Sequence, residues 1–326
     1  MKNDGNRRNR GAFEIRGIVP IVPTPFKPDQ EVDWAALQAL VDFACSSGAC
    51  ALCLPAYASE FYKLSEDERR RAITAAVEHS AGRTPVIGQV NVWSSKLAAE
   101  TALDAQHAGV DAVSVSVPRL FALAEHDIFR YFDRILSAID VPFIIQDFNP
   151  GGPTLSVEFI ANLHMVHPNF RYVKLEEPLM SAKVEAILQK TSGEVGVLEG
   201  WGGMYMLELI PAGICGVMPS LGAADLLARV FQLAERGQKE EAYSIFQAVL
   251  PQIVFSLQNL EFLHHVEKSL LVARGVLREG IVREANLELN FHDRQHLAFL
   301  NNTILETLDR LNLPRNPAAT KRIEQG

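Results

Sequence analysis

Cysteine is scarce in this sequence, which has only Cys45, Cys50, Cys53 and Cys215 among 326 residues. All four lie in apolar segments, and such sparse usage is typical of proteins kept in a reducing compartment. Cys50 and Cys53 form a C-x-x-C pair, but no second Cys or His pair follows at the spacing of a zinc site. We therefore expect buried free thiols, no disulfide and a cytoplasmic location.

Long hydrophobic runs and excess positive charge are also lacking. No apolar stretch reaches the roughly 18 residues that cross a bilayer, and the formal net charge is −8. This composition argues against a membrane or a nucleic acid as a main partner. The short basic run at 6–10 is interpreted as part of a flexible leader over residues 1–16.

What the chain does have is an alternation of short β-prone runs with amphipathic helical stretches between residues 17 and 236. The predicted strands are 17–22, 49–54, 85–90, 112–117, 142–146, 171–175, 195–199 and 214–218. The predicted helices are 34–47, 66–80, 94–108, 125–139, 156–165, 181–190, 204–211 and 223–236. Eight such pairs predict an α/β fold of the (β/α)₈ TIM-barrel type, since an open doubly wound sheet normally has fewer strands.

The segment 237–314 carries no strand signal and is predicted to form helices at 240–250, 260–274 and 293–311. We interpret it as a C-terminal helical extension that packs on the barrel or on a neighbouring subunit. Residues 315–326 are expected to be a loose tail.

Lys174 ends an apolar, β-prone run, where a packed strand would otherwise avoid a charge. Burial lowers the pKa of an ammonium group, and the resulting neutral amine attacks ketones. The alternative is a strand-end lysine that reaches solvent or pairs with Glu176 or Glu177. Because barrel enzymes carry their chemistry at the carboxyl ends of the strands, the loops after each run are the places to examine.

Several motifs in order give the chain a recognisable resemblance. They are Gly-Ile-Val-Pro-Ile-Val-Pro-Thr-Pro-Phe at 17–26, Ser59-Glu60 after the second strand, Arg-Tyr-Val-Lys at 171–174 and Gly-Val-Met at 216–218. The segment from about 17 to 283 resembles the dihydrodipicolinate synthase and N-acetylneuraminate lyase superfamily of class I aldolases. The resemblance implies that Lys174 forms a Schiff base with a 2-oxo acid and that the protein is a homo-oligomer, a tetramer or a dimer.

The sequence departs from the synthases of this superfamily. They carry two threonines where this chain has Tyr57 and Ala58, a tyrosine proton relay where it has Gln146, and another tyrosine after strand 4, where Pro118 is followed by Arg119. No arginine for an aldehyde substrate follows the fifth strand. The pairs Ser59-Glu60 and Gln146-Asp147 and the motif Lys-hydrophobic-Glu at 174–176 are more similar to the branch of L-2-keto-3-deoxyarabonate dehydratase.

The predicted catalytic residues are Lys174, Gln146 and Tyr57. The imine of a 2-oxo acid acidifies its C3 protons, after which a C4 hydroxyl leaves or the C3–C4 bond breaks. The backbone N–H groups of Ala58 and Ser59, with the Ser59 hydroxyl, are expected to hold the substrate carboxylate. The other predicted substrate-binding residues are Glu60, Asp147, Glu176, Gly200 and Met218.

The proton donor is left open between Tyr57, Glu60, Asp147 and a water held by Gln146. Glu60 could instead bond loop backbone, and Ser59 could cap a turn. No cofactor or metal is expected, because adjacent His264 and His265 on a helix point about 100° apart and do not suit one ion.

Three functions follow from the sequence. The first is a lyase acting on a 2-keto-3-deoxy sugar acid, as dehydratase or aldolase. The second is dihydrodipicolinate synthase, acting on pyruvate and aspartate semialdehyde. The third is a barrel that only binds a 2-oxo acid, since the family's relay tyrosine is missing.

Overall fold

The computed structural model describes residues 13–119, 121–149 and 152–319. Its eight strands form one parallel sheet in the order β1-β8-β7-β6-β5-β4-β3-β2. They are β1 (Gly17–Ile18), β2 (Leu52–Leu54), β3 (Val86–Gln89), β4 (Ala112–Ser116), β5 (Phe143–Phe148), β6 (Phe170–Glu176), β7 (Gly196–Glu199) and β8 (Gly216–Val217). The ring closes beyond β1, because Val22 N–H donates to the Cys53 carbonyl at 2.9 Å and Cys53 N–H donates to the Pro20 carbonyl at 3.0 Å.

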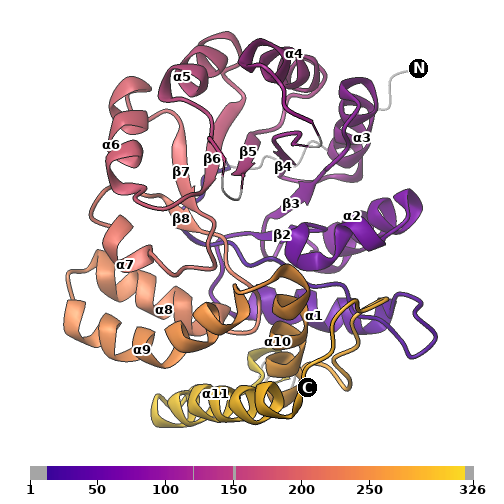
Figure 1. Cartoon of the computed structure of the whole chain (residues 1–326), viewed down its shortest axis with the longest axis vertical. Helices are drawn as coiled ribbons and strands as arrows, with labels where there is room; N and C mark the ends of the chain where they lie inside the picture. Colours follow the sequence, from indigo (N-terminus) through magenta and orange to yellow (C-terminus); the bar gives the residue numbers. More distant parts are fainter. Residues whose placement is uncertain (1–12, 120, 150–151, 320–326) are drawn as a thin grey trace.

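The helices surround this barrel (Figure 1). They are α1 (Trp34–Ser46), α2 (Glu66–Ser80), α3 (Ser95–Ala108), α4 (Glu125–Leu136), α5 (Val157–Val166), α6 (Ser181–Lys190), α7 (Met206–Leu209) and α8 (Ala224–Glu235). Side-chain caps define several starts: Ser65 forms a capping box with Glu68 before α2, and Asp33 accepts from two backbone N–H groups of α1. The predicted (β/α)₈ barrel is confirmed. None of the described helices is long and apolar enough to cross a membrane.

Two short 3₁₀ turns after β2 were not predicted. They are η1 (Tyr57–Ser59) and η2 (Phe61–Lys63), and Glu60 between them has a left-handed backbone with φ of 58°. We call residues 55–64 the strand-2 loop. Its compact turns decide which side chains of the loop face the barrel mouth.

The C-terminal extension consists of α9 (Lys239–Ser256), α10 (Leu260–Ala273) and α11 (Phe291–Arg310). It gathers beside α1 and α8, and α10 contacts the strand-2 loop (Figure 1). Arg274, which is 2% exposed, joins the extension to the barrel through two bonds to Asp225, at 2.8 and 2.6 Å. The helix predicted at 240–250 runs on to Ser256 through Pro251.

Both predicted ends of the ordered chain require correction within the described residues. Ile15 is buried, and its N–H donates to the Tyr172 hydroxyl at 3.0 Å, so the packed chain begins before the leader boundary predicted at residue 16. The Arg315 carbonyl accepts from Arg274 at 2.7 Å and Ala318 is buried, so part of the predicted tail packs on α10. The remaining parts of these predictions, residues 1–12 and 320–326, lie outside the described residues.

Candidate active site

Lys174 and Glu176 lie together at the carboxyl end of β6. Successive side chains of a strand alternate between its faces, so residues two apart share a face. The Lys174 Nζ atom is 2.7 Å from Glu176 Oε1, and the two residues are only 6% and 8% exposed. The pairing with Glu176 that the sequence left as an alternative is therefore present, but the pair lies at the mouth of the barrel rather than in solvent.

A chain of amide and hydroxyl groups holds Glu176 in place. Gln146 Nε2, from β5, donates to Glu176 Oε1 at 2.7 Å. The oxygen of the same amide accepts from Gln89 Nε2 and from Ser116 Oγ, each at 2.9 Å. Since β3, β4 and β5 contribute one residue each, the strand order of the barrel itself assembles this network. Gln146 is consequently fixed as a donor toward the carboxylate.

A cavity of about 160 Å³ opens above this pair. Seven of the predicted site residues line it: Tyr57, Ala58, Gln146, Lys174, Glu176, Gly200 and Met218. They come from β2, β5, β6, β7 and β8 or from the loops that follow them. The barrel therefore brings together residues that are far apart in the sequence.

Gly200 allows the close approach of the reacting pair to the loop after β7. A Cβ atom at this position would lie 2.4 Å from Glu176 Cγ and 2.8 Å from Lys174 Cε. Carbon atoms in contact normally lie about 3.5 to 4.0 Å apart. Any larger residue here would have to displace Lys174 and Glu176.

Tyr57 lies against the same group of residues. Burial and the nearby Glu176 carboxylate raise the pKa of Tyr57, while a hydrogen bond with Ser116 opposes the shift. Its ring also packs against Phe148, with the ring centres 5.6 Å apart. The Tyr57 hydroxyl is thus a neutral group at the edge of the cavity.

The structure corrects the prediction for three residues, none of which lines the cavity. The Ser59 hydroxyl donates to the Val22 carbonyl at 2.6 Å and accepts from Ala56 N–H, and the Ser59 N–H donates to the Ala56 carbonyl. Ser59 is therefore a turn-forming serine. The compact 3₁₀ turn directs its side chain to the barrel wall.

Asp147 likewise bonds to residues of the loops rather than facing the cavity. Its carboxylate accepts from Arg119 at 2.8 Å and from Leu155 N–H at 2.6 Å, and burial raises its pKa. Asp147 alternates with Gln146 along β5 and points to the other face of the strand. The Asp147 side chain therefore bonds the loops and does not line the cavity, contrary to its predicted place in the substrate site.

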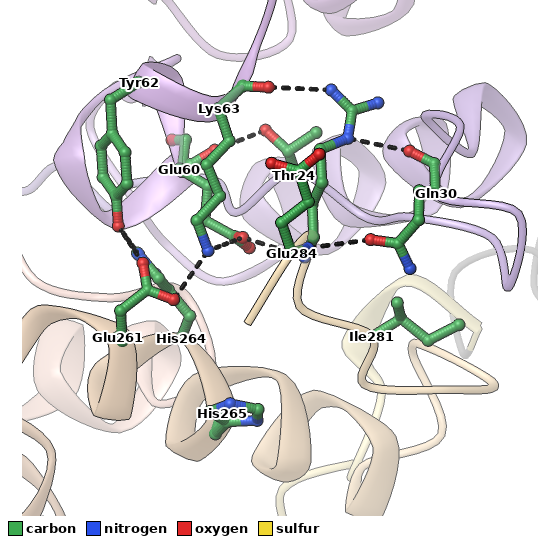
Figure 2. A network of polar contacts seen from close by, with 12 residues as sticks. Thr24, Gln30, Glu60, Tyr62, Lys63, Glu261, His264, His265, Ile281 and Glu284 are labelled. Atoms are coloured by element: carbon green, nitrogen blue, oxygen red, sulfur yellow. Dashed lines mark hydrogen bonds and ion pairs between the residues drawn. The ribbon is translucent and has the colours of Figure 1, made fainter. Parts of the chain in front are cut away.

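Glu60 faces the C-terminal extension. Its carboxylate is fully buried and lies 2.5 Å from Lys268 Nζ of α10 and 3.2 Å from Lys63 Nζ. Lys63 also pairs with Glu261 at 2.7 Å, and the Tyr62 hydroxyl donates to Glu261 at 2.5 Å. Figure 2 shows these groups of the strand-2 loop facing α10. Glu60 therefore fixes the loop, which is the alternative that the sequence had left open.

Sequence reasoning missed two features of the site. Leu260 and Leu263 of the C-terminal extension line the cavity together with Trp201 and Phe148. Glu199, at the end of β7, is fully buried and accepts from Gly203 N–H at 2.7 Å, and burial raises its pKa to about 7. The signal for Glu199 was available, since it is a charge at the end of an apolar strand, as Lys174 is.

No group of three or more His, Cys, Asp and Glu side chains in residues 13–119, 121–149 and 152–319 is placed to hold a metal.

Residues 14–302 match the model of the dihydrodipicolinate synthetase family. The chain belongs to this family. The prediction of a class I aldolase-type lyase in this superfamily is thereby confirmed at the level of the family.

The chain is similar to relatives that are named for different activities. The chain is 31% identical to L-2-keto-3-deoxyarabonate dehydratase of Azospirillum brasilense over 269 residues, which are 81% of this chain and 84% of the relative. It is 26% identical to 4-hydroxy-tetrahydrodipicolinate synthase of Phocaeicola vulgatus over 234 residues, 71% of this chain and 78% of that one.

A solved structure supports the fold. The dihydrodipicolinate synthase of Rhodopseudomonas palustris superposes with a TM-score of 0.82 at 24% identity, covering 90% of this chain and 98% of that one. At this identity the likeness concerns the fold alone.

Proposed function

We propose that this protein is a Schiff-base lyase whose Lys174 attacks the C2 carbonyl of a 2-keto-3-deoxy sugar acid. The observation that carries the proposal is the position of Lys174. It is buried on the wall of a cavity at the mouth of the barrel, and its Nζ atom lies 2.7 Å from the Glu176 carboxylate. The similarity to the dehydratase of Azospirillum brasilense supports a sugar acid as the substrate class.

Glu176 is the proton carrier in this proposal. Its carboxylate takes a proton from the Lys174 ammonium group, and the free amine adds to C2. A second proton passes from the added nitrogen to the C2 oxygen, and the carboxyl group returns its own proton to that oxygen. The oxygen then leaves as water and yields the protonated imine. Glu176, held by Gln146 at 2.7 Å, then removes a C3 proton and produces the enamine. Gln146 thus replaces the family's tyrosine by orienting a different acid and base.

Two reactions can follow from the protonated imine: dehydration by way of the enamine, or aldol cleavage of the imine itself. In dehydration, Glu176 gives its proton to the C4 hydroxyl, which leaves as water, and hydrolysis of the conjugated imine releases the product. In aldol cleavage, C3 is not deprotonated first: a base takes the proton of the C4 hydroxyl of the imine, the C3–C4 bond breaks and an aldehyde leaves. The enamine that remains on Lys174 is protonated at C3 and hydrolysed. We favour dehydration, because it uses Glu176, the one carboxyl group among the described residues that line the cavity, for both proton transfers.

The carboxylate of the substrate is assigned to the strand-2 loop. The first N–H groups of a helical turn lack partners within that turn. Ala58 opens η1 together with Tyr57, and both residues line the cavity. The Ala58 N–H and the Tyr57 hydroxyl are therefore the proposed donors, in place of the Ser59 groups.

Proton exchange at C3 of pyruvate separates this enzyme from a barrel that only binds a 2-oxo acid. We expect NMR in deuterium oxide to show exchange with the wild type and none with Lys174→Ala. Binding of pyruvate without exchange would favour the binding protein. Formation of the synthase product from pyruvate and aspartate semialdehyde, at a rate above dehydration, would instead favour the dihydrodipicolinate synthase reading.

A homo-oligomer, dimer or tetramer, is part of the proposal. Trp93, Leu97, Phe121 and Leu123 follow β3 and β4 and are 42% to 75% exposed, and Trp93 and Leu123 line one surface hollow. Exposed apolar groups that gather in one place are typical of protein interfaces. Light scattering after size exclusion tests this, and a monomer at micromolar concentration would contradict it.

The four free thiols favour the cytoplasmic location.

A further inference from the structure

The charges that line the cavity suggest which substrates it accepts. Lys174 and Glu176 are the only charged side chains among the described residues of its wall, and they pair with each other at 2.7 Å. Once Lys174 has formed an imine, no other lining cation remains for a second carboxylate. The remaining acid, Glu176, would repel one.

Cations on the neighbouring loops are already paired. Arg119 lies 2.8 Å from Asp147, and Lys183 lies 3.0 Å from Glu177. Lys63 and Lys268 bond Glu261 and Glu60, as described above. A second carboxylate in the cavity would therefore be buried without an opposite charge, which is unfavourable.

The part of the wall that comes from the C-terminal extension is apolar. Leu257, Leu260 and Leu263 contribute to it, and the polar residue between them, Asn259, caps α10 through its Oδ1, which accepts from Glu261 N–H at 2.8 Å. This wall has a fixed position, because the buried pair of Glu60 and Lys268 ties α10 to the strand-2 loop.

We propose that the site selects a 2-oxo monocarboxylate with a short, uncharged far end, and that α10 supplies the wall that enforces this choice. The inference rests on the proposed function and narrows its substrate class. The cavity of about 160 Å³ fits this size, since a cavity of about 150 Å³ in another protein holds one benzene molecule.

Three compounds with one skeleton test the selection. They are 4-hydroxy-2-oxopentanoate, 4,5-dihydroxy-2-oxopentanoate and 4-hydroxy-2-oxopentanedioate, whose far ends are a methyl, a hydroxymethyl and a carboxylate group. Consumption followed by NMR covers dehydration and cleavage alike. We expect the first two to have kcat/KM values within about tenfold of each other and the dicarboxylate to be at least about 100-fold slower. A dicarboxylate consumed as fast as the others would overturn the inference.

A variant pair tests the role of α10. Leu260→Arg should raise the ratio of dicarboxylate to monocarboxylate turnover at least about tenfold above that of Leu260→Gln, which is polar but uncharged. Leu257→Arg with Leu257→Gln repeats the test if the first pair unfolds. Equal ratios in both pairs would remove α10 from the proposal.

An experiment with pyruvate distinguishes a failure of this inference from a failure of the proposed function. An imine with pyruvate, trapped by borohydride, together with fast turnover of the dicarboxylate would reject only the substrate selection. The absence of any trapped imine would reject both.

Discussion

Substitution of Gly200 by alanine perturbs the proposed reacting pair directly. The added Cβ would lie 2.4 Å from Glu176 Cγ and 2.8 Å from Lys174 Cε, so these side chains must move by about 1 Å to reach normal contact distances. Overpacking of this kind costs about 1 to 3 kcal/mol of stability. A displacement of about 1 Å in a reacting group can lower the rate about 100-fold.

Gly196→Ala is the matched control. Gly196 begins β7, the strand that Gly200 follows, and its added Cβ would lie 2.8 Å from both Cys215 Sγ and Tyr172 Cδ1. Neither of these neighbours lines the cavity. We therefore expect a similar loss of stability from both variants in thermal unfolding, but a loss of activity from Gly200→Ala alone.

The assay is C3 proton exchange of pyruvate in deuterium oxide, measured well below the unfolding temperature of each variant. Gly200→Ala should exchange about 100-fold more slowly than the wild type, and Gly196→Ala within about threefold of it. Exchange at the wild-type rate by Gly200→Ala would refute the reasoning. Equal losses in both variants would show that packing of β7, rather than the position of Lys174, limits the reaction.

Three further predictions concern carboxylates. Glu176→Gln should slow C3 exchange by about 10² to 10⁴-fold while borohydride still traps an adduct on Lys174, and undiminished exchange would exclude Glu176 as the base. Lys268→Met should lower the free energy of unfolding in urea by about 3 to 5 kcal/mol, because it leaves Glu60 buried with its closest partner removed. Adding Glu60→Gln should restore part of that loss, and a strictly additive double variant would contradict the pairing. Burial raises the pKa of Glu199 to about 7 from 4.5, so its contribution to stability is complete below pH 4.5 and is lost as the pH rises through 7. Between pH 4.5 and 8, the free energy of unfolding of Glu199→Gln in urea should therefore rise by about 3 kcal/mol relative to that of the wild type. Parallel pH profiles of the two proteins would contradict this.

The barrel was predictable because its signal is local. Each strand and helix is indicated by hydrophobic periodicity within about a dozen residues. Because parallel connections are right-handed, eight such pairs can adopt few alternative topologies. Lys174 and Glu176 were predictable for the same reason, since a charge at the end of an apolar strand is visible in the sequence.

The parts of the site that could not be predicted depend on contacts between segments that are distant in the sequence. Glu60 pairs with Lys268, which is 208 residues away, and no local pattern indicates that the two meet. Leu260 and Leu263 look like ordinary core residues of an amphipathic helix, and only the packing of α10 on the strand-2 loop places them on the cavity wall. Ser59 was misassigned because the direction of its side chain depends on the 3₁₀ turn, which the sequence did not reveal.

The central claim is that Lys174 forms a covalent imine with a 2-oxo acid, and borohydride trapping tests it most directly. The protein is incubated with pyruvate or with a 2-keto-3-deoxypentonate, reduced, and analysed by intact mass and peptide mapping. The account predicts one adduct per chain on Lys174 and none in Lys174→Ala. An adduct that persists in Lys174→Ala, or no adduct with either compound, would contradict it.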